Sequence, residues 1–348
     1  MNLTKIIHHF FSTAIVGIEI DNKNCNVVVK FYRGGKHIRT QTKTFKTIPG
    51  ELPAQAVWFI RKIYAKNPFT YIVALSSSII QGAINTNRKE DFSQYGINAD
   101  EVVKKSFSDG WSVYVSKEGI AETKKRFLKL GVDFIISPFL VLYHLAKDTF
   151  QENHCKLYIL FQRSNMTMIV TKSNSGVLFG GYYALESEID SELKIVKNSF
   201  NQEEEEESAD ITKDIQQELS EIGDVDLDNE EGDDALIEIL KGEDKQEEEI
   251  KDENLEQDND DLDDFSRVNM ATKFIQSAMS EFYSNDIYKS EFITEIVLFN
   301  PNNISTETLK QIQNFTMLEV KIMPCNIAET LVDLGFESYQ FFEARGEV

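Results

Sequence analysis

The chain has 348 residues, a length that allows one large or two medium domains with an ample core. Its formal net charge is −22 and 41% of its residues are hydrophobic, which excludes a wholly disordered protein. No apolar run is long enough to span a bilayer, so we expect no direct membrane span. Three widely separated cysteines predict neither a disulfide framework nor a metal site, and we expect a cytoplasmic protein.

The negative charge is concentrated in residues 203–264, which hold 30 acidic and four basic residues. The rest of the chain has a net charge of +4. Because the acidic segment lacks aromatic residues and its like charges repel, we predict a disordered insert. Two apolar stretches within it, 211–222 and 235–240, are interpreted as residual apolar content rather than as docking motifs.

Residues 1–97 are predicted to form a first lobe. Residues 14–20 and 26–33 are β-rich and separated by a turn, and Gly34-Gly35 leads into a third strand over 37–46. A helix follows Pro53, and residues 71–75 form a buried strand. The helix is predicted to bury Ala56, Phe59, Ile60 and Ile63.

Residues 98–136 are predicted to form a small α+β subdomain. We expect a helix that begins at Asn98 or Asp100 and runs to Phe107, and then a strand over 111–116. Ser116 is predicted to cap a further helix, which a strand over 132–136 follows. Pro138 opens a helix, and residues 137–155 are predicted to return to the first lobe.

Residues 156–202 and 265–348 are predicted to form a second lobe on either side of the acidic insert. Three strands are expected over 156–161, 166–170 and 177–183, with a helix over 186–200. After the insert we expect an apolar helical stripe, a strand over 293–299, a helix over 305–315, a strand over 318–323 and a C-terminal helix from Asn326. The stripe consists of Ala271, Phe274, Ile275, Ala278, Met279 and Phe282. The order β-β-β-α-β therefore occurs twice, which predicts an α/β fold of two similar lobes facing a cleft.

Four stretches of the chain resemble the actin-like ATPase superfamily, which has a ribonuclease H-like fold. They cover residues 16–29, 73–84, 178–185 and 274–300. Within that superfamily the sequence looks most like PilM of type IV pilus machines and the cytoplasmic part of GspL of type II secretion. The resemblance implies two lobes made of duplicated β-β-β-α-β units around a nucleotide cleft.

Most residues with which that superfamily holds Mg-phosphate are absent here. The resemblance places Glu19 and Asp21 at the Asp-x-Gly turn of the first lobe, with Asp21 in place of the glycine. It places Gln162 in the corresponding turn of the second lobe, which has no carboxylate, and Asn300 at the adenosine loop. We therefore predict a degenerate cleft and a pseudo-ATPase without catalytic residues, cofactor or metal. ATP and Mg are disfavoured, although asparagine-rich turns leave weak nucleotide binding open.

The resemblance to PilM implies a non-catalytic scaffold of an envelope-spanning machine, such as a type IV pilus, a type II secretion system or a flagellar motor. Such a protein binds the cytoplasmic tail of a single-pass, PilN-like inner-membrane protein, and it is peripheral at the inner membrane through that partner. Self-association into a ring stays open. We place the partner groove at Trp111, Val113 and Tyr114.

Three alternatives to the scaffold function make different demands on the sequence. An ATP-binding actin-like ATPase conflicts with the missing Asp and Gly residues. A polymerising homologue of the cell-division type would be detected by a sedimentation assay. A nucleic-acid role is disfavoured because no basic patch is visible in the sequence.

Overall fold

The computed structural model describes residues 12–48, 50–150, 154–172, 176–185, 253–301 and 306–345. The helix predicted over 186–200 and residues 203–252 of the predicted insert lie outside this part of the chain. Contacts divide the chain into one unit of residues 1–185 and 264–348 and a second unit of residues 186–263. The sheets and cores below belong to the first unit.

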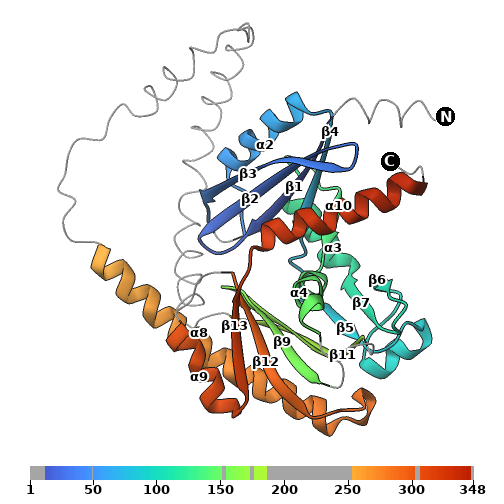
Figure 1. Cartoon of the computed structure of the whole chain (residues 1–348), viewed down its shortest axis with the longest axis vertical. Coiled ribbons are helices and arrows are strands. Elements are labelled where there is room, and N and C mark those ends of the chain that lie inside the picture. Colours follow the sequence, from blue (N-terminus) through green and yellow to red (C-terminus); the bar gives the residue numbers. More distant parts are fainter. Residues whose placement is uncertain are drawn as a thin grey trace, which may run out of the picture. The chain divides into compact units, whose positions relative to one another are not determined.

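The first half of the chain forms a five-stranded sheet with the order β3-β2-β1-β4-β8 (Figure 1). Strand β2 is antiparallel to both β1 and β3, whereas β4 is parallel to β1 and β8 is parallel to β4. Helix α2 (Ala54–Lys66) buries Ala56, Ile60 and Ile63 against one face of this sheet, which confirms most of the predicted apolar face. The strands are β1 (Thr13–Ile20), β2 (Asn24–Arg33), β3 (Lys36–Lys46), β4 (Phe69–Leu75) and β8 (Phe134–Ile136).

A second five-stranded sheet has the order β11-β10-β9-β12-β13. Its directions match those of the first sheet, because β9, β10 and β11 are antiparallel neighbours, whereas β12 is parallel to both β9 and β13. Helix α8 (Glu253–Ser284) covers it, and α9 (Thr306–Thr316) connects β12 to β13. The strands are β9 (Cys155–Phe161), β10 (Asn165–Thr171), β11 (Val177–Ala184), β12 (Ile293–Asn300) and β13 (Glu319–Pro324).

Helix α8 confirms the apolar stripe, but it begins earlier than the sequence indicated. Ala271, Ile275, Ala278 and Phe282 are buried against the second sheet. The helix starts at Glu253, within the acidic segment whose end was predicted at residue 264. The acidic composition of residues 253–264 therefore does not prevent helix formation next to a stripe that packs firmly.

The subdomain contains a three-stranded sheet with the order β5-β7-β6, made of β5 (Gln81–Ile84), β7 (Ser112–Ser116) and β6 (Val102–Ser106). The helix predicted to end at Phe107 is wrong, because β6 is a strand that pairs with β7. The backbone N–H of Phe107 donates to the Trp111 carbonyl at 2.9 Å and closes the hairpin, so cross-strand pairing overrides the capping signal. A short 3₁₀ helix, Lys89–Tyr95, lies between β5 and β6.

Two helix starts in this region follow the prediction. The Ser116 side chain accepts a hydrogen bond from the Gly119 N–H at the start of α3 (Lys117–Arg126). The Ser137 side chain accepts from the Phe139 N–H at the start of α4 (Pro138–Ala146), where proline occupies the first turn. Two further 3₁₀ turns follow, at Lys147–Thr149 and Asp286–Tyr288.

Helix α10 (Ile327–Arg345) lies against the first sheet, although its sequence follows the second (Figure 1). A Cβ on Gly17 of β1 would overlap the Ala328 carbonyl oxygen, and a Cβ on Gly335 of α10 would overlap Val73. Two glycines therefore allow the helix to approach the sheet closely. Helix α4 in turn contacts β9 and β10 of the second sheet and also α10.

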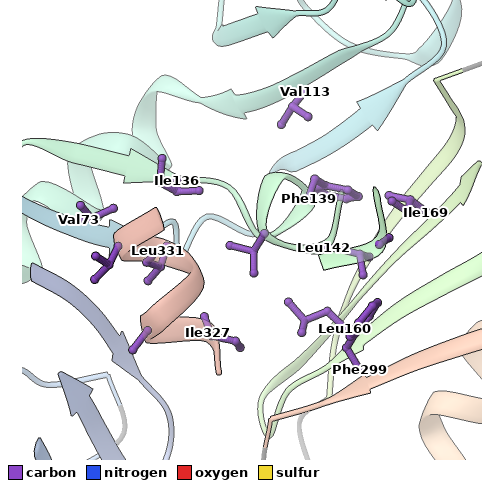
Figure 2. Packing of buried hydrophobic residues seen from close by; sticks show 14 of the residues in the cluster. Val73, Val113, Ile136, Phe139, Leu142, Leu160, Ile169, Phe299, Ile327 and Leu331 are labelled. Carbon is purple, nitrogen blue, oxygen red and sulfur yellow. The ribbon is translucent and has the colours of Figure 1, made fainter. Parts of the chain in front are cut away.

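These two helices join both sheets through one hydrophobic core (Figure 2). Phe139 of α4 lies beside Ile169, and Leu142 of α4 lies near Leu160. Ile327 and Leu331 of α10 belong to the same cluster. Continuous burial from one sheet to the other indicates that the two halves pack as parts of a single unit. Among the described residues, no helix combines the length and the apolar character needed to cross a membrane.

Candidate functional site

The turn between β1 and β2 is closed by the side chain of Asp21. The Asp21 Oδ1 atom accepts hydrogen bonds from the backbone N–H groups of Lys23 and Asn24, each at 2.6 Å. The Asp21 N–H donates to the Asn24 carbonyl at 2.9 Å and completes the turn. A carboxylate of the chain itself therefore occupies the anion position that backbone N–H groups of such a turn would otherwise offer.

Glu19 lies beside this turn, in β1, and only 4% of its surface is exposed. Burial raises the pKa of Glu19 to about 7, with a further rise from the Asp21 charge and a partial decrease from the Asn26 hydrogen bond. The Asn26 Nδ2 atom donates to Glu19 Oε2 at 3.3 Å. A carboxyl pKa raised in this way is typical of functional sites and also of buried structural carboxyl groups, so it does not by itself assign a role to Glu19.

Glu19 also lies close to residues from both halves of the unit. Burial and the nearby Glu19 charge raise the pKa of the Cys25 and Cys325 thiols to about 12. Cys25 is on β2, whereas Cys325 follows β13 and precedes α10. The carboxyl end of β1 therefore lies near the carboxyl end of β13.

Gln162 and Asn300 lie at the same edge of the second sheet. Gln162 directly follows β9, Asn300 ends β12, and these neighbouring strands are parallel. Asn300 is also paired in register with Pro324, the residue before Cys325. The structure thus brings Glu19 and this edge into one region, as expected for the carboxyl ends of parallel strands.

The turn between β9 and β10 contains buried polar atoms without a hydrogen-bond partner in the described part of the chain. They include Gln162 Oε1, Asn165 Oδ1 and Arg163 Nε. Only 4% of the Gln162 surface is exposed, so its unpaired amide oxygen is costly. The side chains here are amides and a guanidinium, and a carboxylate that could orient metal-bound water is absent from residues 161–165.

The buried side chain of Arg267 fixes this second turn. Its Nη2 atom donates to the Gln162 carbonyl and its Nε atom to the Arg163 carbonyl, both at 2.9 Å. Only 3% of Arg267 is exposed, and its guanidinium lies 5.4 Å from the centre of the Phe161 ring. Arg267 was not predicted from the sequence as part of this turn. Arg267 precedes Ala271 by four positions, so extending the apolar stripe of α8 by one helical turn would have found it.

Two of the three residues predicted to form the partner groove are buried. Trp111 has 0% exposure, and its ring stacks on Phe107 at 4.1 Å between centroids. Val113 lies in the core cluster that joins the two sheets. Tyr114 is half-buried, and its ring meets Phe92 edge-on at 6.5 Å. The groove stays a prediction, and Tyr114 is the residue through which it can be tested without opening the core.

In the described residues, no group of three or more His, Cys, Asp or Glu side chains could hold a metal ion. The candidate site consists of two polar turns, one closed by the Asp21 carboxylate and the other by the buried Arg267.

Comparison with protein families divides the chain at the same place as its two sheets. Residues 157–340, more than half of the chain, match the family described as "Domain of unknown function (DUF8341)". The chain belongs to that family. Residues 10–143 match a second family, described as "Domain of unknown function (DUF8569)". A search of curated proteins found no match.

Solved structures similar to this chain include a Bacteroides thetaiotaomicron protein with an actin-like ATPase fold and unknown function, at 9% identity and a TM-score of 0.42 over 96% of this chain and 99% of the other. A PilM-PilN type IV pilus biogenesis complex matches at 13% identity and a TM-score of 0.47, over 91% and 89%. The activator of 2-hydroxyisocaproyl-CoA dehydratase from Clostridium difficile, with bound ADPNP, matches at 10% identity and a TM-score of 0.38, over 97% and 98%.

Proposed function

We propose that this chain is a non-catalytic, actin-like scaffold with a degenerate nucleotide cleft. It binds the cytoplasmic tail of a single-pass inner-membrane protein in an envelope-spanning machine, such as a type IV pilus, a type II secretion system or a flagellar motor. It is cytoplasmic and reaches the inner membrane through that partner. The actin-like part of this proposal is supported by two sheets with the same strand order and directions, which duplication of one unit would produce.

The observation that carries the proposal is the self-closed turn at Asp21. In a turn that holds phosphate, backbone N–H groups point at the anion. Here the N–H groups of Lys23 and Asn24 already donate to the Asp21 carboxylate. A phosphate would have to displace this carboxylate and approach its negative charge. The first turn is therefore unsuited to Mg-phosphate, and no catalytic step through a nucleotide follows.

The second turn supports the same conclusion. Gln162 and Asn165 contribute amide groups, and Arg267 is occupied by the carbonyl oxygens of the turn. Asn300 is buried, with 5% exposure, and Pro301 follows it. The three positions that the superfamily uses for phosphate, metal and base thus carry side chains with different chemistry.

The proposed partner follows from the sequence resemblance to PilM and GspL. A scaffold without catalysis requires a binding surface, and an extended tail can bind through main-chain hydrogen bonds and side-chain pockets. Binding of a single tail is expected to be modest and to become tight through several copies in a ring.

Millimolar Mg-ATP is expected to leave the melting temperature of this protein unchanged. A ligand at 100 times its dissociation constant stabilises a protein by about 2.7 kcal/mol, which corresponds to a shift of several degrees. The measurement is thermal unfolding with and without Mg-ATP. A clear shift with the wild-type protein, abolished by Asp21→Ala, would contradict the pseudo-ATPase.

A companion variant tests the role of the Asp21 side chain. Asp21→Gly frees both N–H groups of the turn and removes a negative charge, so it should bind inorganic phosphate or ATP better than the wild type. Asp109→Gly, in the β6–β7 hairpin, is the matched control and should gain nothing. Equal responses of the two variants would show that Asp21 does not block the turn.

A further inference from the structure

Positive charge is concentrated on the first sheet and its helix α2, although the net charge of the whole chain is strongly negative. Residues 22–66 contain ten Lys and Arg residues and one acidic residue, Glu51. Outside both this stretch and the acidic segment, 27 acidic residues exceed 22 basic ones. Neither β3 nor α2 contains an aspartate or a glutamate.

The fold places cations from β3 and α2 on one surface, which we call the basic face. It consists of Arg39, Lys43, Trp58, Lys62 and Lys66, all of them exposed. The Lys43 Nζ atom lies 5.1 Å from the centre of the Phe59 ring, and the rings of Phe45 and Phe59 are 6.0 Å apart between their centroids. The edge strand β3 and helix α2 are therefore adjacent. Figure 1 shows β3 and α2 side by side.

Aromatic rings support the side chains of these cations. The guanidinium carbon of Arg39 lies 4.1 Å from the centre of the Phe31 ring, and the Lys62 Nζ atom lies 3.5 Å from the centre of the Trp58 ring. Within the described residues, no carboxylate lies within ion-pair distance of Arg39, Lys43, Lys62 or Lys66. By contrast, Lys30 on the other face of the sheet is paired with Glu329 and Asp333 of α10.

Trp58 is the unusual member of the basic face, since 58% of its surface is exposed. The apolar side of α2 is already buried, through Ala56, Val57, Ile60 and Ile63. The helix therefore cannot insert into a bilayer as an amphipathic helix does, and Trp58 is its exposed large apolar side chain among the cations. Tryptophan with lysine and arginine is the composition that proteins place at the headgroup layer of a membrane.

We propose that the basic face binds the headgroups of an anionic lipid bilayer, with Trp58 entering the interfacial layer. The occupant is a lipid surface rather than an acidic peptide, because the outer side of a helix is convex and because an exposed tryptophan adds to headgroup binding but not to charge pairing. The site is separate from the tail-binding function proposed above and needs no partner protein. It would hold the scaffold against the membrane in a defined orientation.

The acidic segment opposes this binding through its charge of −26. Salt screens such opposition beyond about 8 Å at physiological ionic strength, whereas cations in contact with headgroups keep their attraction. Each lysine or arginine near an anionic membrane contributes about a fivefold gain in affinity. Binding should therefore be measurable with the full chain and should weaken as salt is raised.

The test is co-sedimentation of the full chain with phosphatidylcholine vesicles that contain phosphatidylglycerol, compared with pure phosphatidylcholine vesicles. We expect binding to the anionic vesicles alone. Lys43→Gln with Lys62→Gln should weaken it about 25-fold, and Trp58→Ala should weaken it several-fold. The matched control is Lys273→Gln with Lys310→Gln, which removes two exposed lysines from α8 and α9 and should bind like the wild type.

Three results would overturn the proposal. They are equal binding to both kinds of vesicle, equal losses in the test and control variants, and tighter binding to soluble polyglutamate or a DNA duplex than to anionic vesicles of equal charge concentration. The last result would assign the basic face to an acidic protein or a nucleic acid. None of these results bears on Mg-ATP or on tail binding, so failure here is distinguishable from failure of the proposed function.

Discussion

Replacing Trp111 with alanine is expected to destabilise the protein by about 3–5 kcal/mol. Trp111 has 0% exposure and stacks on Phe107, and its ring lies 4.7 Å from that of Tyr143. A Cβ on Gly176 would already come within 2.5 Å of its ring, so this side chain fills a tightly packed space. Truncation leaves a cavity that the surrounding core cannot close. Urea denaturation of the wild type and the variant measures the difference.

Trp58→Ala is the matched control, because it makes the same chemical change at a tryptophan that is 58% exposed. Its effect on stability should be within about 1 kcal/mol. Trp111→Phe should cost less than Trp111→Ala, because it keeps an aromatic ring and removes an indole N–H that has no hydrogen-bond partner among the described residues. Equal stability of the two alanine variants would show that Trp111 is not a core residue and would return it to the partner groove.

Glu19→Gln is expected to stabilise the protein by up to roughly 3 kcal/mol above pH 8 and to change little below pH 4. Burial raises the pKa of Glu19 from 4.5 to about 7. Between pH 4.5 and about pH 7, Glu19 has released its proton in the unfolded chain but still holds it in the folded protein. The stability of the wild type therefore falls as the pH rises through this window, and the neutral amide removes that part of the pH dependence.

The measurement is the free energy of unfolding of both proteins at several pH values, from below pH 4 to above pH 8. Glu118→Gln, at an exposed position of α3, serves as the control and should leave the pH dependence unchanged. A Glu19→Gln variant whose stability runs parallel to that of the wild type over the whole range would show that Glu19 ionises as an exposed carboxyl group does.

Local patterns predicted most of the elements of this fold. Alternating or continuous apolar runs located most strands of the two large sheets, because such strands are buried on one or both faces. The mostly exposed strand β3 was located instead by the Gly34-Gly35 turn before it. Ser116 and Pro138 marked two helix starts, because the first turn of a helix is determined by neighbouring residues. The strand β6 was missed, because its pairing with β7 depends on a hairpin rather than on its own composition.

Long-range packing could not be predicted in the same way. Helix α10 packs on the first sheet through Gly17 and Gly335, residues that are separated by most of the chain. The burial of Trp111 likewise depends on Gly176 and Tyr143, which come from other elements. The alternating pattern of β7 predicted that one of its faces is buried, but it did not indicate which of the two faces that is.

The candidate site was likewise predictable in its residue types but not in its contacts. The resemblance to actin-like proteins singled out Glu19, Asp21, Gln162 and Asn300, and the chemistry of their side chains already argued against Mg-phosphate. The sequence did not predict that Asp21 accepts hydrogen bonds within its own turn, nor that Arg267 donates to the carbonyl oxygens of the second turn. Both depend on side-chain positions that the structure provides. Charges spread over residues 39–66 were not recognised as a basic face, because apolar residues separate them in the sequence.

The most direct test of the scaffold function is calorimetry with synthetic peptides that correspond to the cytoplasmic tails of single-pass inner-membrane proteins encoded beside this gene. We predict that one tail binds with micromolar affinity in the absence of nucleotide, and that Tyr114→Ala weakens binding while the protein remains folded. Full-strength binding by folded Tyr114→Ala would place the groove elsewhere. Failure of the folded wild-type protein to bind any of these tails would contradict the scaffold function itself.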